Sequence, residues 1–329
     1  MRPKVLLTRA FQDKPIKYLL EISELTIGNY ERNLKKEEII ELVRDKEALI
    51  SLLADPIDRD VIDSAPNLKI ISNYAVGYNN IDYDCCIKKG IYVTHTPGVL
   101  TEATADIAFA LLLAVSRRIV ESHNFVLEDK FKGWEPNLLL GKEISGKTVG
   151  IIGMGRIGKA FARRCKGFGM NVIYYSRTRL SKKEESTLGV EFKELNELLR
   201  ESDFISLHIP LTKESYHLLS KERLELLKKD AVLINTARGP IVDEEYLIKM
   251  LKKRRIFGAG FDVYEREPVV PDELKNLDNV VLLPHIGSAT VETREKMAMM
   301  SIKAIEDFFK GKTPENLIPE WKKFLNGKS

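Results

Sequence analysis

The chain has 329 residues, long enough for two domains, and its 44% hydrophobic and 30% charged residues are typical of an ordinary soluble globular protein. The net charge of +4 comes from Lys and Arg dispersed among Asp and Glu, so we expect no nucleic-acid partner. No apolar run reaches the roughly 20 residues of a membrane span, and the first ten residues lack a signal-peptide core. The three cysteines have no metal-ligand spacing. These features predict a cytoplasmic protein with small-molecule partners, no membrane partner and no metal.

The first hundred residues alternate short β-rich runs with charged amphipathic stretches. The expected strands are KVLLT, LTIGNY, ALISLL, LKIISNY and IYVTHT. Strands that alternate with amphipathic helices favour a parallel sheet covered by those helices. We therefore expect a small doubly wound domain over residues 1–99.

The stretch TEATADIAFALLLAVSRRIV, residues 101–120, predicts a buried helix that connects two domains. Thr101 can cap it, Glu102 complements the helix dipole, and apolar residues surround nearly every side. A loop-rich arm follows at residues 131–147. Trp134 and the leucines at 138–140 would suit the interface of a homodimer, although these side chains could equally fold back on their own domain.

From residue 147 the alternation of strands and helices resumes. The expected strands are KTVGIIG, NVIYYS, DFISLHIP, AVLINTA, GAGFDV and NVVLLPH, which together predict a second, larger parallel sheet over residues 100–286. Apolar residues near helical spacing in 289–311 predict a final helix, long enough to return to the first domain. The first domain would then be discontinuous, made of residues 1–99 and 287–329.

A dinucleotide-binding loop is predicted at residues 153–158. Gly153, Gly155 and Gly158 have G-x-G-x-x-G spacing, follow an apolar strand and open a helix. In that context the first glycine permits the tight turn, the second lets the backbone approach a pyrophosphate, and the third allows the helix to pack closely on the strand. Met154, Arg156 and Ile157 complete the predicted loop.

The acidic ribose ligand expected about 20 residues further on is missing, because Ser176, Arg177 and Thr178 occupy that place. A carboxylate would bind the ribose hydroxyls and repel a 2′-phosphate, whereas Arg pairs with phosphate through a planar fork. We therefore expect NADP(H) to be preferred, with NAD(H) possible. The alternative is that Arg177 and Arg179 are solvated loop charges and that NAD is held without the acid.

Three later strands are each followed by chemically useful side chains. Arg238 follows the first, Asp262 and Glu267 follow the second, and His285 follows the third. Ligands of open α/β sheets bind outside the carboxyl ends of the strands, so these side chains could face one site. Reduction of a 2-keto acid needs a cation for the substrate and an acid for the forming alkoxide, which Arg238 and a His285–Glu267 pair can supply. Taken singly, His285 could instead be a structural histidine, and Arg238 and Glu267 a simple ion pair.

The chain resembles the D-isomer-specific 2-hydroxyacid dehydrogenases, and within that family it is most similar to the glyoxylate/hydroxypyruvate reductases. Its sequence contains the family's motifs in the order in which the family has them. The motifs are NYAVGYNNID, GIYVTHTPGVLTEATADIAFALLLA, VGIIGMGRIG, LHIPLT, LINTARGPIVDE, GAGFDVYEREP and LLPHIGSAT. The resemblance implies an α/β fold of two Rossmann-like, doubly wound, parallel-sheet domains, the smaller one discontinuous and flavodoxin-like. It also implies that Arg238 binds substrate and assists catalysis, that His285 is the acid/base with Glu267 as its partner, and that Asp262 orients the nicotinamide.

The resemblance extends to the residues that hold the ligands. The substrate would be bound by Leu53, by the backbone amides of Val76 and Gly77, and by Arg238 and His285. A glycine-containing loop can turn amides toward an anion, although residues 75–80 could also be a plain strand-to-helix turn. Besides the glycine loop and residues 176–178, the cofactor would contact His208, Pro210, Thr236, Ala237, Arg238, Asp262, His285, Ile286 and Gly287. His208 is a rival catalytic histidine that the resemblance places beside the adenine.

The predicted function is NAD(P)H-dependent reduction of glyoxylate or hydroxypyruvate to glycolate or D-glycerate. One alternative is another 2-keto acid, such as 2-ketogluconate or phosphohydroxypyruvate, although the latter would need basic residues near 52–55, where none occurs. Phosphite oxidation is disfavoured, because the resemblance would then require a lysine at Val76. A dinucleotide-sensing, corepressor-like binding protein is the third hypothesis, and it would be expected to carry a partner-binding extension.

Overall fold

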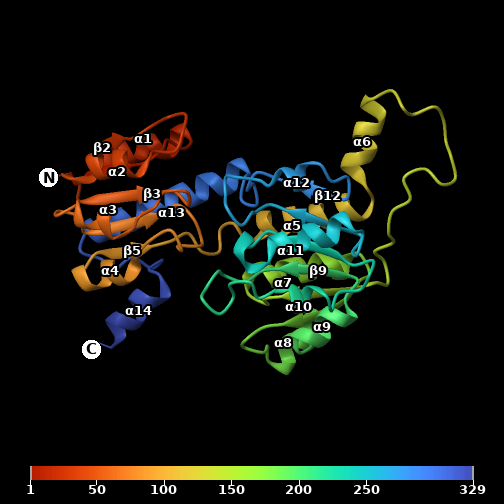
Figure 1. Cartoon of the computed structure of the whole chain (residues 1–329). Helices are drawn as coiled ribbons and strands as arrows, with labels where there is room; N and C mark the ends of the chain where they lie inside the picture. Colours follow the sequence, from red (N-terminus) through yellow and green to blue (C-terminus); the bar gives the residue numbers. More distant parts are fainter. Residues whose placement is uncertain (1, 328–329) are drawn as a thin grey trace. The chain divides into compact units, whose positions relative to one another are not determined.

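The computed structural model describes residues 2–327, which separate into two compact units (Figure 1). The first unit comprises Met1–Leu100 and Ala289–Ser329, and the second comprises Thr101–Ser288. The sequence places the boundaries slightly earlier, after residues 99 and 286. Each unit has its own sheet and its own buried core.

The sheet of the first unit contains five parallel strands in the order β2-β1-β3-β4-β5. The strands are β1 (Lys4–Leu7), β2 (Glu24–Ile27), β3 (Ala48–Ser51), β4 (Ile70–Asn73) and β5 (Tyr92–Thr94). The central strands β1, β3 and β4 consist of almost wholly buried residues, as expected for parallel strands covered on both faces. The order 2-1-3-4-5 is that of the flavodoxin-like fold, which confirms the expected class of the smaller domain.

Helices from both ends of the chain complete the first unit. They are α1 (Asp13–Ile22), α2 (Lys36–Val43), α3 (Arg59–Asp63), α4 (Tyr83–Lys89), α13 (Val291–Phe309) and α14 (Pro319–Asn326). Thr290 caps α13 by accepting a hydrogen bond from the amide of Thr293. In α14 the indole of the buried Trp321 donates to the carbonyl of Ile91, 2.9 Å away. The C-terminal segment is therefore part of the first unit's core.

The second unit has a seven-stranded parallel sheet in the order β12-β11-β10-β9-β6-β7-β8. The strands are β6 (Thr148–Ile152), β7 (Asn171–Tyr175), β8 (Val190–Phe192), β9 (Phe204–Leu207), β10 (Val232–Asn235), β11 (Gly258–Phe261) and β12 (Val280–Leu282). Read from β8, this is the Rossmann order 3-2-1-4-5-6 with one further strand, which confirms the expected class. Strand β8 is absent from the sequence prediction, because the charged Glu191 interrupts its three residues and leaves no apolar run to indicate a strand.

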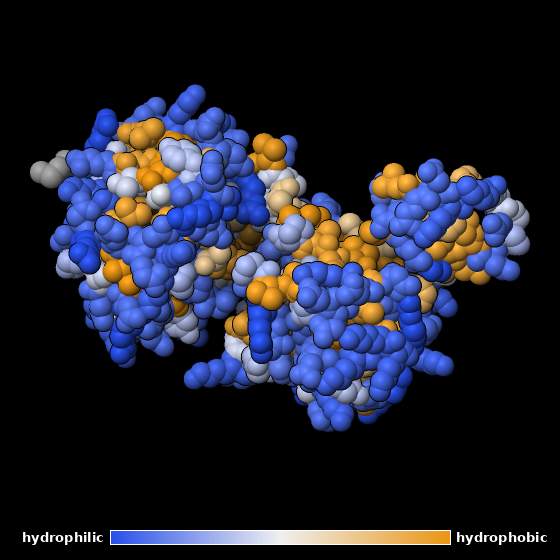
Figure 2. Space-filling view, turned by 45° about the horizontal axis from the view of Figure 1, so that its top comes forward, coloured by the Kyte–Doolittle hydropathy of each residue, from blue (hydrophilic) through white to orange (hydrophobic). Residues whose placement is uncertain are grey.

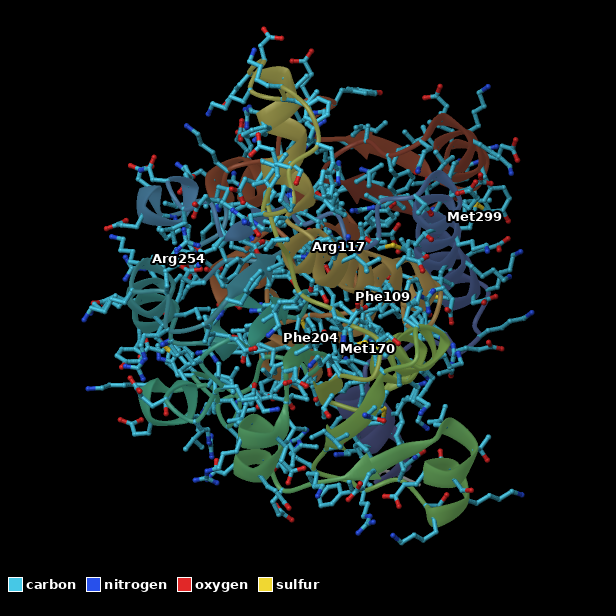
Figure 3. The ribbon with its side chains drawn as sticks, turned by 90° about the vertical axis from the view of Figure 1, so that its right-hand side faces the viewer. Phe109, Arg117, Met170, Phe204, Arg254 and Met299 are labelled. Carbon is cyan, nitrogen blue, oxygen red and sulfur yellow. The ribbon has the colours of Figure 1, made fainter. Side chains whose placement is uncertain are left out.

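Helices cover both faces of this larger sheet. They are α5 (Thr101–Ser116), α6 (Ile119–Leu127), α7 (Arg156–Gly167), α8 (Lys182–Leu188), α9 (Leu195–Glu201), α10 (Lys221–Leu224), α11 (Glu244–Lys252) and α12 (Asp272–Lys275), with a 3-10 turn at Gly239–Ile241. Phe109 of α5 belongs to the core of one face together with Met170 and Phe204 (Figure 3). Leu233, which alternates with neighbours that face this core, belongs to the core of the opposite face.

The predicted helix 101–120 is wrong in one respect, because α5 ends at Ser116. Arg118 has a left-handed backbone, with φ of 53°, and α6 then starts in a new direction. The arm returns to this point, where the amide of Lys142 donates to the carbonyl of Ser116 at 2.7 Å. A Cβ at Gly141 would lie 2.3 Å from that same carbonyl oxygen, so only glycine fits there. The end of α5 is therefore fixed by a residue 26 positions later in the chain.

Helix α6 and the arm that follows project from the second unit (Figure 1). None of the residues of α6 is buried, and Trp134 is 85% exposed. The space-filling view shows hydrophobic atoms gathered on this projecting segment (Figure 2). The alternative in which these side chains fold back on their own domain is therefore wrong for Trp134, whereas Leu138 and Leu139 are half-buried. No helix in residues 2–327 is long and apolar enough to cross a membrane.

Candidate active site

The glycine loop connects β6 to α7, and each of its three glycines has a different environment. Gly153 has φ of +102°, and a Cβ there would lie 2.4 Å from the carbonyl oxygen of His208. A Cβ at Gly158 would lie 2.0 Å from the carbonyl oxygen of Gly153, so the helix could not pack against the turn. No atom lies within 4 Å of a Cβ built at Gly155. That open space is where a pyrophosphate would approach the backbone.

The start of α7 is suited to bind an anion. The amides of Gly155, Arg156 and Ile157 donate to no acceptor within residues 2–327, and the first turn contains no acidic residue. Unpaired amides at a helix N-terminus, together with the positive end of the helix dipole, attract phosphate. Thr236 provides a second sign of a ligand, because its buried hydroxyl has no hydrogen-bond partner in the described part of the chain. These residues fit a dinucleotide.

In the segment after β7, Arg177 and Arg179 have different environments. Arg177 and Thr178 are exposed, and Arg177 forms no ion pair within the described chain. Arg179 instead bonds Glu185 at 2.7 Å and stacks over Phe192, with 4.9 Å between the guanidinium and the ring centroid. The bond from Arg179 is the main cause that lowers the pKa of Glu185 to about 2. Arg179 thus has a structural partner, and Arg177 is the cation available to a ligand.

His208 follows β9 and is not suited to be the proton donor. Its Nε2 lies 2.9 Å from the hydroxyl of Ser206, and its ring packs 5.0 Å from that of Phe161, centroid to centroid. Burial lowers the pKa of His208 to about 3. The ring is therefore neutral at physiological pH, so the imidazolium that could protonate an alkoxide is not populated. Pro210, two residues later, is exposed.

Arg238 lies in a turn directly after β10 that is held by its neighbours. The side-chain amide of Asn235 donates to the carbonyl of Arg238 at 2.9 Å, and its oxygen accepts from the amide of Ala237 at 3.1 Å. A Cβ at Gly239 would lie 1.9 Å from the carbonyl carbon of Tyr264. The turn that carries Arg238 therefore packs directly on the segment that leads to Glu267.

His285 and Glu267 form a hydrogen-bonded pair. Nδ1 of His285 lies 2.8 Å from Oε2 of Glu267, and Oε1 of Glu267 accepts from the amide of Tyr264 at 3.0 Å. The two side chains are 30% and 34% exposed, so the pair can reach a ligand. Burial raises the pKa of Glu267, but the bond and charge of His285, the Tyr264 amide and the charge of Arg238 together lower it below its ordinary value. Glu267 is accordingly a carboxylate at neutral pH.

Arg238 belongs to the same electrostatic cluster as this pair. Burial lowers the pKa of Arg238, and the carboxylate of Glu267 partly offsets that effect. Because an arginine stays protonated over any physiological pH, the guanidinium remains a cation. A cation, a carboxylate and an imidazole from three separate strand ends are thus brought together, as the sequence predicts.

Asp262 holds the backbone just after His285. Its side chain is only 1% exposed, and its two oxygens accept from the amides of Ile286 and Gly287, each at 2.7 Å. Burial raises the pKa of Asp262, and the two amides oppose that effect. The carboxylate therefore fixes the turn that presents His285. Its expected contact with the nicotinamide stays a prediction.

The predicted substrate residues of the first unit lie in two loops. Leu53 follows β3, whereas Val76 and Gly77 follow β4, and all three are half-buried. The carbonyls of the loop after β4 are held by donors of its own unit, as described below, and its role in binding the substrate stays a prediction.

The sequence analysis missed a group of residues that support the site. Asn235 donates to the carbonyl of Arg238, and the amide of Tyr264 donates to the carboxylate of Glu267, while Glu244 accepts from the amide of Glu265 at 3.2 Å. Glu265 also has a histidine partner, because its Oε1 lies 3.1 Å from Nε2 of His217. The available signal was the carboxamide at the end of a strand in LINTARG, a position that often holds a turn.

Neither a metal site nor a role of the connecting helix in the reaction is visible. In the described chain, no three His, Cys, Asp or Glu side chains are grouped as metal ligands would be. Asp106 of α5 pairs with Arg164 of α7 at 2.5 Å, and Glu102 bonds the same guanidinium at 2.9 Å. These acids join two helices of the second unit.

Comparisons with known proteins find relatives that match nearly the whole chain. A family model described as D-isomer specific 2-hydroxyacid dehydrogenase, NAD binding domain, matches residues 109–287. The glyoxylate reductase of Thermococcus litoralis is 52% identical over 322 residues, covering 97% of each chain. The crystal structure of a Thermus thermophilus protein has a TM-score of 0.90 at 44% identity and covers 96% of this chain and 99% of that one. The NADPH-dependent glyoxylate/hydroxypyruvate reductase of Sinorhizobium meliloti, in complex with NADP and malonate, has a TM-score of 0.86 at 31% identity, covering 97% and 98%.

The fold and the matched domain define an oxidoreductase with a nicotinamide-dinucleotide domain of the Rossmann type. The chain belongs to the D-isomer specific 2-hydroxyacid dehydrogenase family. The resemblance stated from the motifs is thereby confirmed, and glyoxylate reductases are among its relatives.

Proposed function

We propose that the protein reduces a small 2-keto acid, glyoxylate or hydroxypyruvate, to the D-2-hydroxy acid with NADPH as the reductant. The observation that carries this proposal is the His285–Glu267 pair, 2.8 Å between its bonding atoms, in one electrostatic cluster with Arg238. Relatives that cover nearly the whole chain are glyoxylate reductases, which supports the choice of substrate.

Different residues of the chain would bind the substrate, polarise it and donate the proton in such a reduction. The nicotinamide, when bound, supplies the hydride. Arg238 binds the substrate's carboxylate and polarises its keto oxygen, and the amides of the loop at Val76 and Gly77 bind the carboxylate. Glu267 accepts a hydrogen bond from Nδ1–H of His285, which leaves Nε2 to donate a proton to the forming alkoxide. Glu267 also stabilises the imidazolium that serves as the acid.

The choice of NADPH rests on the segment after β7. The 2′-phosphate would be bound by the hydroxyls of Ser176 and Thr178 and by the guanidinium of Arg177, with no carboxylate at the end of the strand to repel it. The pyrophosphate would lie at Gly155 and the start of α7, and the hydroxyl of Thr236 would gain a partner. Asp262 would orient the nicotinamide end through the turn that it holds.

We also propose that helix α6 and the arm that follows it form the interface of a homodimer. Ile119, Val126, Leu127, Phe131 and Trp134 are all exposed hydrophobic residues within one short segment. Helix α6 has only nine residues and no buried side chain, so it would be marginal in water by itself. A second copy is the occupant we favour, because a two-fold interface lets the same arm cover its counterpart. Trp134→Glu should convert a dimer to monomer in light scattering, and a wild-type monomer would refute the proposal.

A cytoplasmic location is part of the proposal. Cys85, Cys86 and Cys165 are buried and unpaired in the structure, and burial raises the pKa of the Cys86 and Cys165 thiols. Thiols of this kind persist in a reducing compartment. Fractionation of cells that make the protein tests this point.

The decisive experiment measures steady-state reduction of glyoxylate, hydroxypyruvate, pyruvate and 2-ketogluconate, each with NADPH and with NADH. We expect glyoxylate or hydroxypyruvate with NADPH to give the highest kcat/KM. If both of these acids were inert while 2-ketogluconate was reduced, the substrate would be a larger keto acid. If all four acids were inert although NADPH bound, the protein would be a nucleotide-binding protein rather than a reductase.

A further inference from the structure

The loop at residues 75–78 of the first unit has three successive carbonyls that are each held by a donor from the same unit. The carbonyl of Ala75 accepts from the amide of Thr96 at 2.9 Å. The carbonyl of Val76 lies 2.8 Å from Nδ1 of His95, and that of Gly77 accepts from the side-chain amide of Asn73 at 2.8 Å. The peptide planes of the loop are therefore fixed.

Fixing these carbonyls also fixes the amides. In a trans peptide the N–H of one residue points opposite to the carbonyl of the residue before it. The N–H groups of Val76, Gly77 and Tyr78 are therefore turned away from the donors that hold the loop. Within residues 2–327 none of these three amides has an acceptor. Successive unpaired amides of this kind are suited to bind a carboxylate.

The bond to Val76 also defines the state of His95. A carbonyl oxygen can only accept, so the proton of this bond must be on Nδ1 of the imidazole. His95 is itself held by the C-terminal segment, because its amide donates to the carbonyl of Asn316 at 3.0 Å and its carbonyl accepts from the Asn316 side chain at 2.6 Å. The ring of Tyr78 packs edge-on against that of His95, with 5.4 Å between centroids, and its hydroxyl donates to Glu320 at 2.9 Å.

We propose that His95 is a positioning residue for the reaction: by donating from Nδ1 to the Val76 carbonyl it aims the Gly77 amide at the substrate's carboxylate. Asn73 has the same role for the amide of Tyr78. The inference rests on the proposed function, because it assumes that the loop binds the carboxylate of a 2-keto acid. It extends the set of predicted carboxylate donors, Val76 and Gly77, by one residue.

The test compares two substitutions of similar size at one position. His95→Asn retains an N–H donor close to where Nδ1 lies, whereas His95→Leu has no donor. We expect His95→Leu to raise KM for glyoxylate about tenfold or more, with kcat and the KM for NADPH nearly unchanged. His95→Asn should stay within about threefold of wild type for the same reason. A general loss of stability would not distinguish Asn from Leu in this way.

Asn171→Ala provides a matched control in the second unit. It removes another side-chain amide that donates to a glycine carbonyl, that of Gly146 at 3.0 Å, and should leave every kinetic constant unchanged. Wild-type KM in His95→Leu, or equal damage in both His95 variants, would overturn the inference while the proposed function stands. If wild-type protein reduced none of the keto acids, both would fall.

A spectroscopic measurement tests the inference without any substitution. In wild-type protein labelled with ¹⁵N-histidine, the His95 ring should carry a proton on Nδ1 that is coupled to a carbonyl acceptor. A neutral ring protonated only at Nε2 could not donate to Val76 and would overturn the inference even if His95→Leu failed to fold.

Discussion

The carboxylate of Glu267 and the imidazole of His285 lie 2.8 Å apart, although neither residue belongs to a helix or a strand. A different contact between a carboxylate and backbone amides holds each of the two residues in place. The amide of Tyr264 fixes Glu267, and Asp262 fixes the two amides that follow His285. One carboxylate therefore orients the ring, and another orients the chain that carries it.

The first prediction concerns the proton donor. His285→Ala should lower kcat about 10²- to 10⁴-fold, the usual contribution of general acid catalysis, while the Kd for NADPH stays close to that of wild type. Glu267→Gln should give a smaller loss, because the amide can still accept from Nδ1 but cannot stabilise an imidazolium. Stopped-flow reduction and fluorescence titration of NADPH measure the two quantities. Full activity in Glu267→Gln would rule out its role.

The second prediction is a dependence of stability on pH. The pKa of Glu267 is lowered in the folded state, so its ionisation stabilises the fold above the ordinary glutamate pKa, and this contribution is lost as pH falls through the lowered folded value. Any stability advantage of wild type over Glu267→Gln should therefore shrink as the pH falls below about 5. Urea unfolding of both proteins at several pH values measures it. A difference that did not change with pH would contradict the prediction.

The third prediction separates the glycines of the nucleotide loop. Gly155→Ala should leave the unfolding temperature nearly unchanged, since nothing lies within 4 Å of the new Cβ, yet weaken NADPH binding about tenfold or more. Gly158→Ala should destabilise the second unit by about 1–3 kcal/mol, because its Cβ would meet the Gly153 carbonyl. Calorimetry and nucleotide titration distinguish the two effects. Tight NADPH binding by Gly155→Ala would place the pyrophosphate elsewhere.

The fourth prediction concerns the two arginines after β7. Arg177→Ala should raise the Kd for NADPH about tenfold and leave the Kd for NADH unchanged, since it removes a charged bond to the 2′-phosphate. Arg179→Ala is the matched control, because that guanidinium is already bonded to Glu185 at 2.7 Å. It should change neither constant appreciably. A wild-type preference for NADH that Arg177→Ala did not alter would remove the proposal of a phosphate site.

Much of the fold and of the candidate site was predictable, because the sequence patterns that indicate them lie within short stretches of the chain. The alternation of apolar runs and amphipathic stretches predicted every strand of both sheets except β8. The spacing of Gly153, Gly155 and Gly158 predicted a turn, an open approach and a close contact, and the built Cβ positions agree with those three environments. Arg238, Glu267 and His285 could be grouped as candidate site residues because parallel strands present their carboxyl ends at one edge.

The remaining features depend on tertiary contacts that no local sequence pattern shows. The end of α5 at Ser116 is set by Gly141 and Lys142, which no helix pattern can reveal. The pairing of Arg179 with Glu185 follows from how α8 folds back on β7, so charge alone could not separate Arg179 from Arg177. In the same way, the position of Asp262 after β11 predicts an acid that faces a ligand. In the structure its two oxygens accept hydrogen bonds from amides 24 and 25 residues later.

The left-handed backbone at His285, with φ of 57°, sets a limit on engineering this protein. An imidazole at such a position costs about 1–3 kcal/mol of conformational energy, which glycine would largely relieve. Variants selected only for heat resistance would therefore tend to discard this histidine. Selection for thermal stability must therefore include a selection for turnover, because the proposed proton donor occupies this strained position.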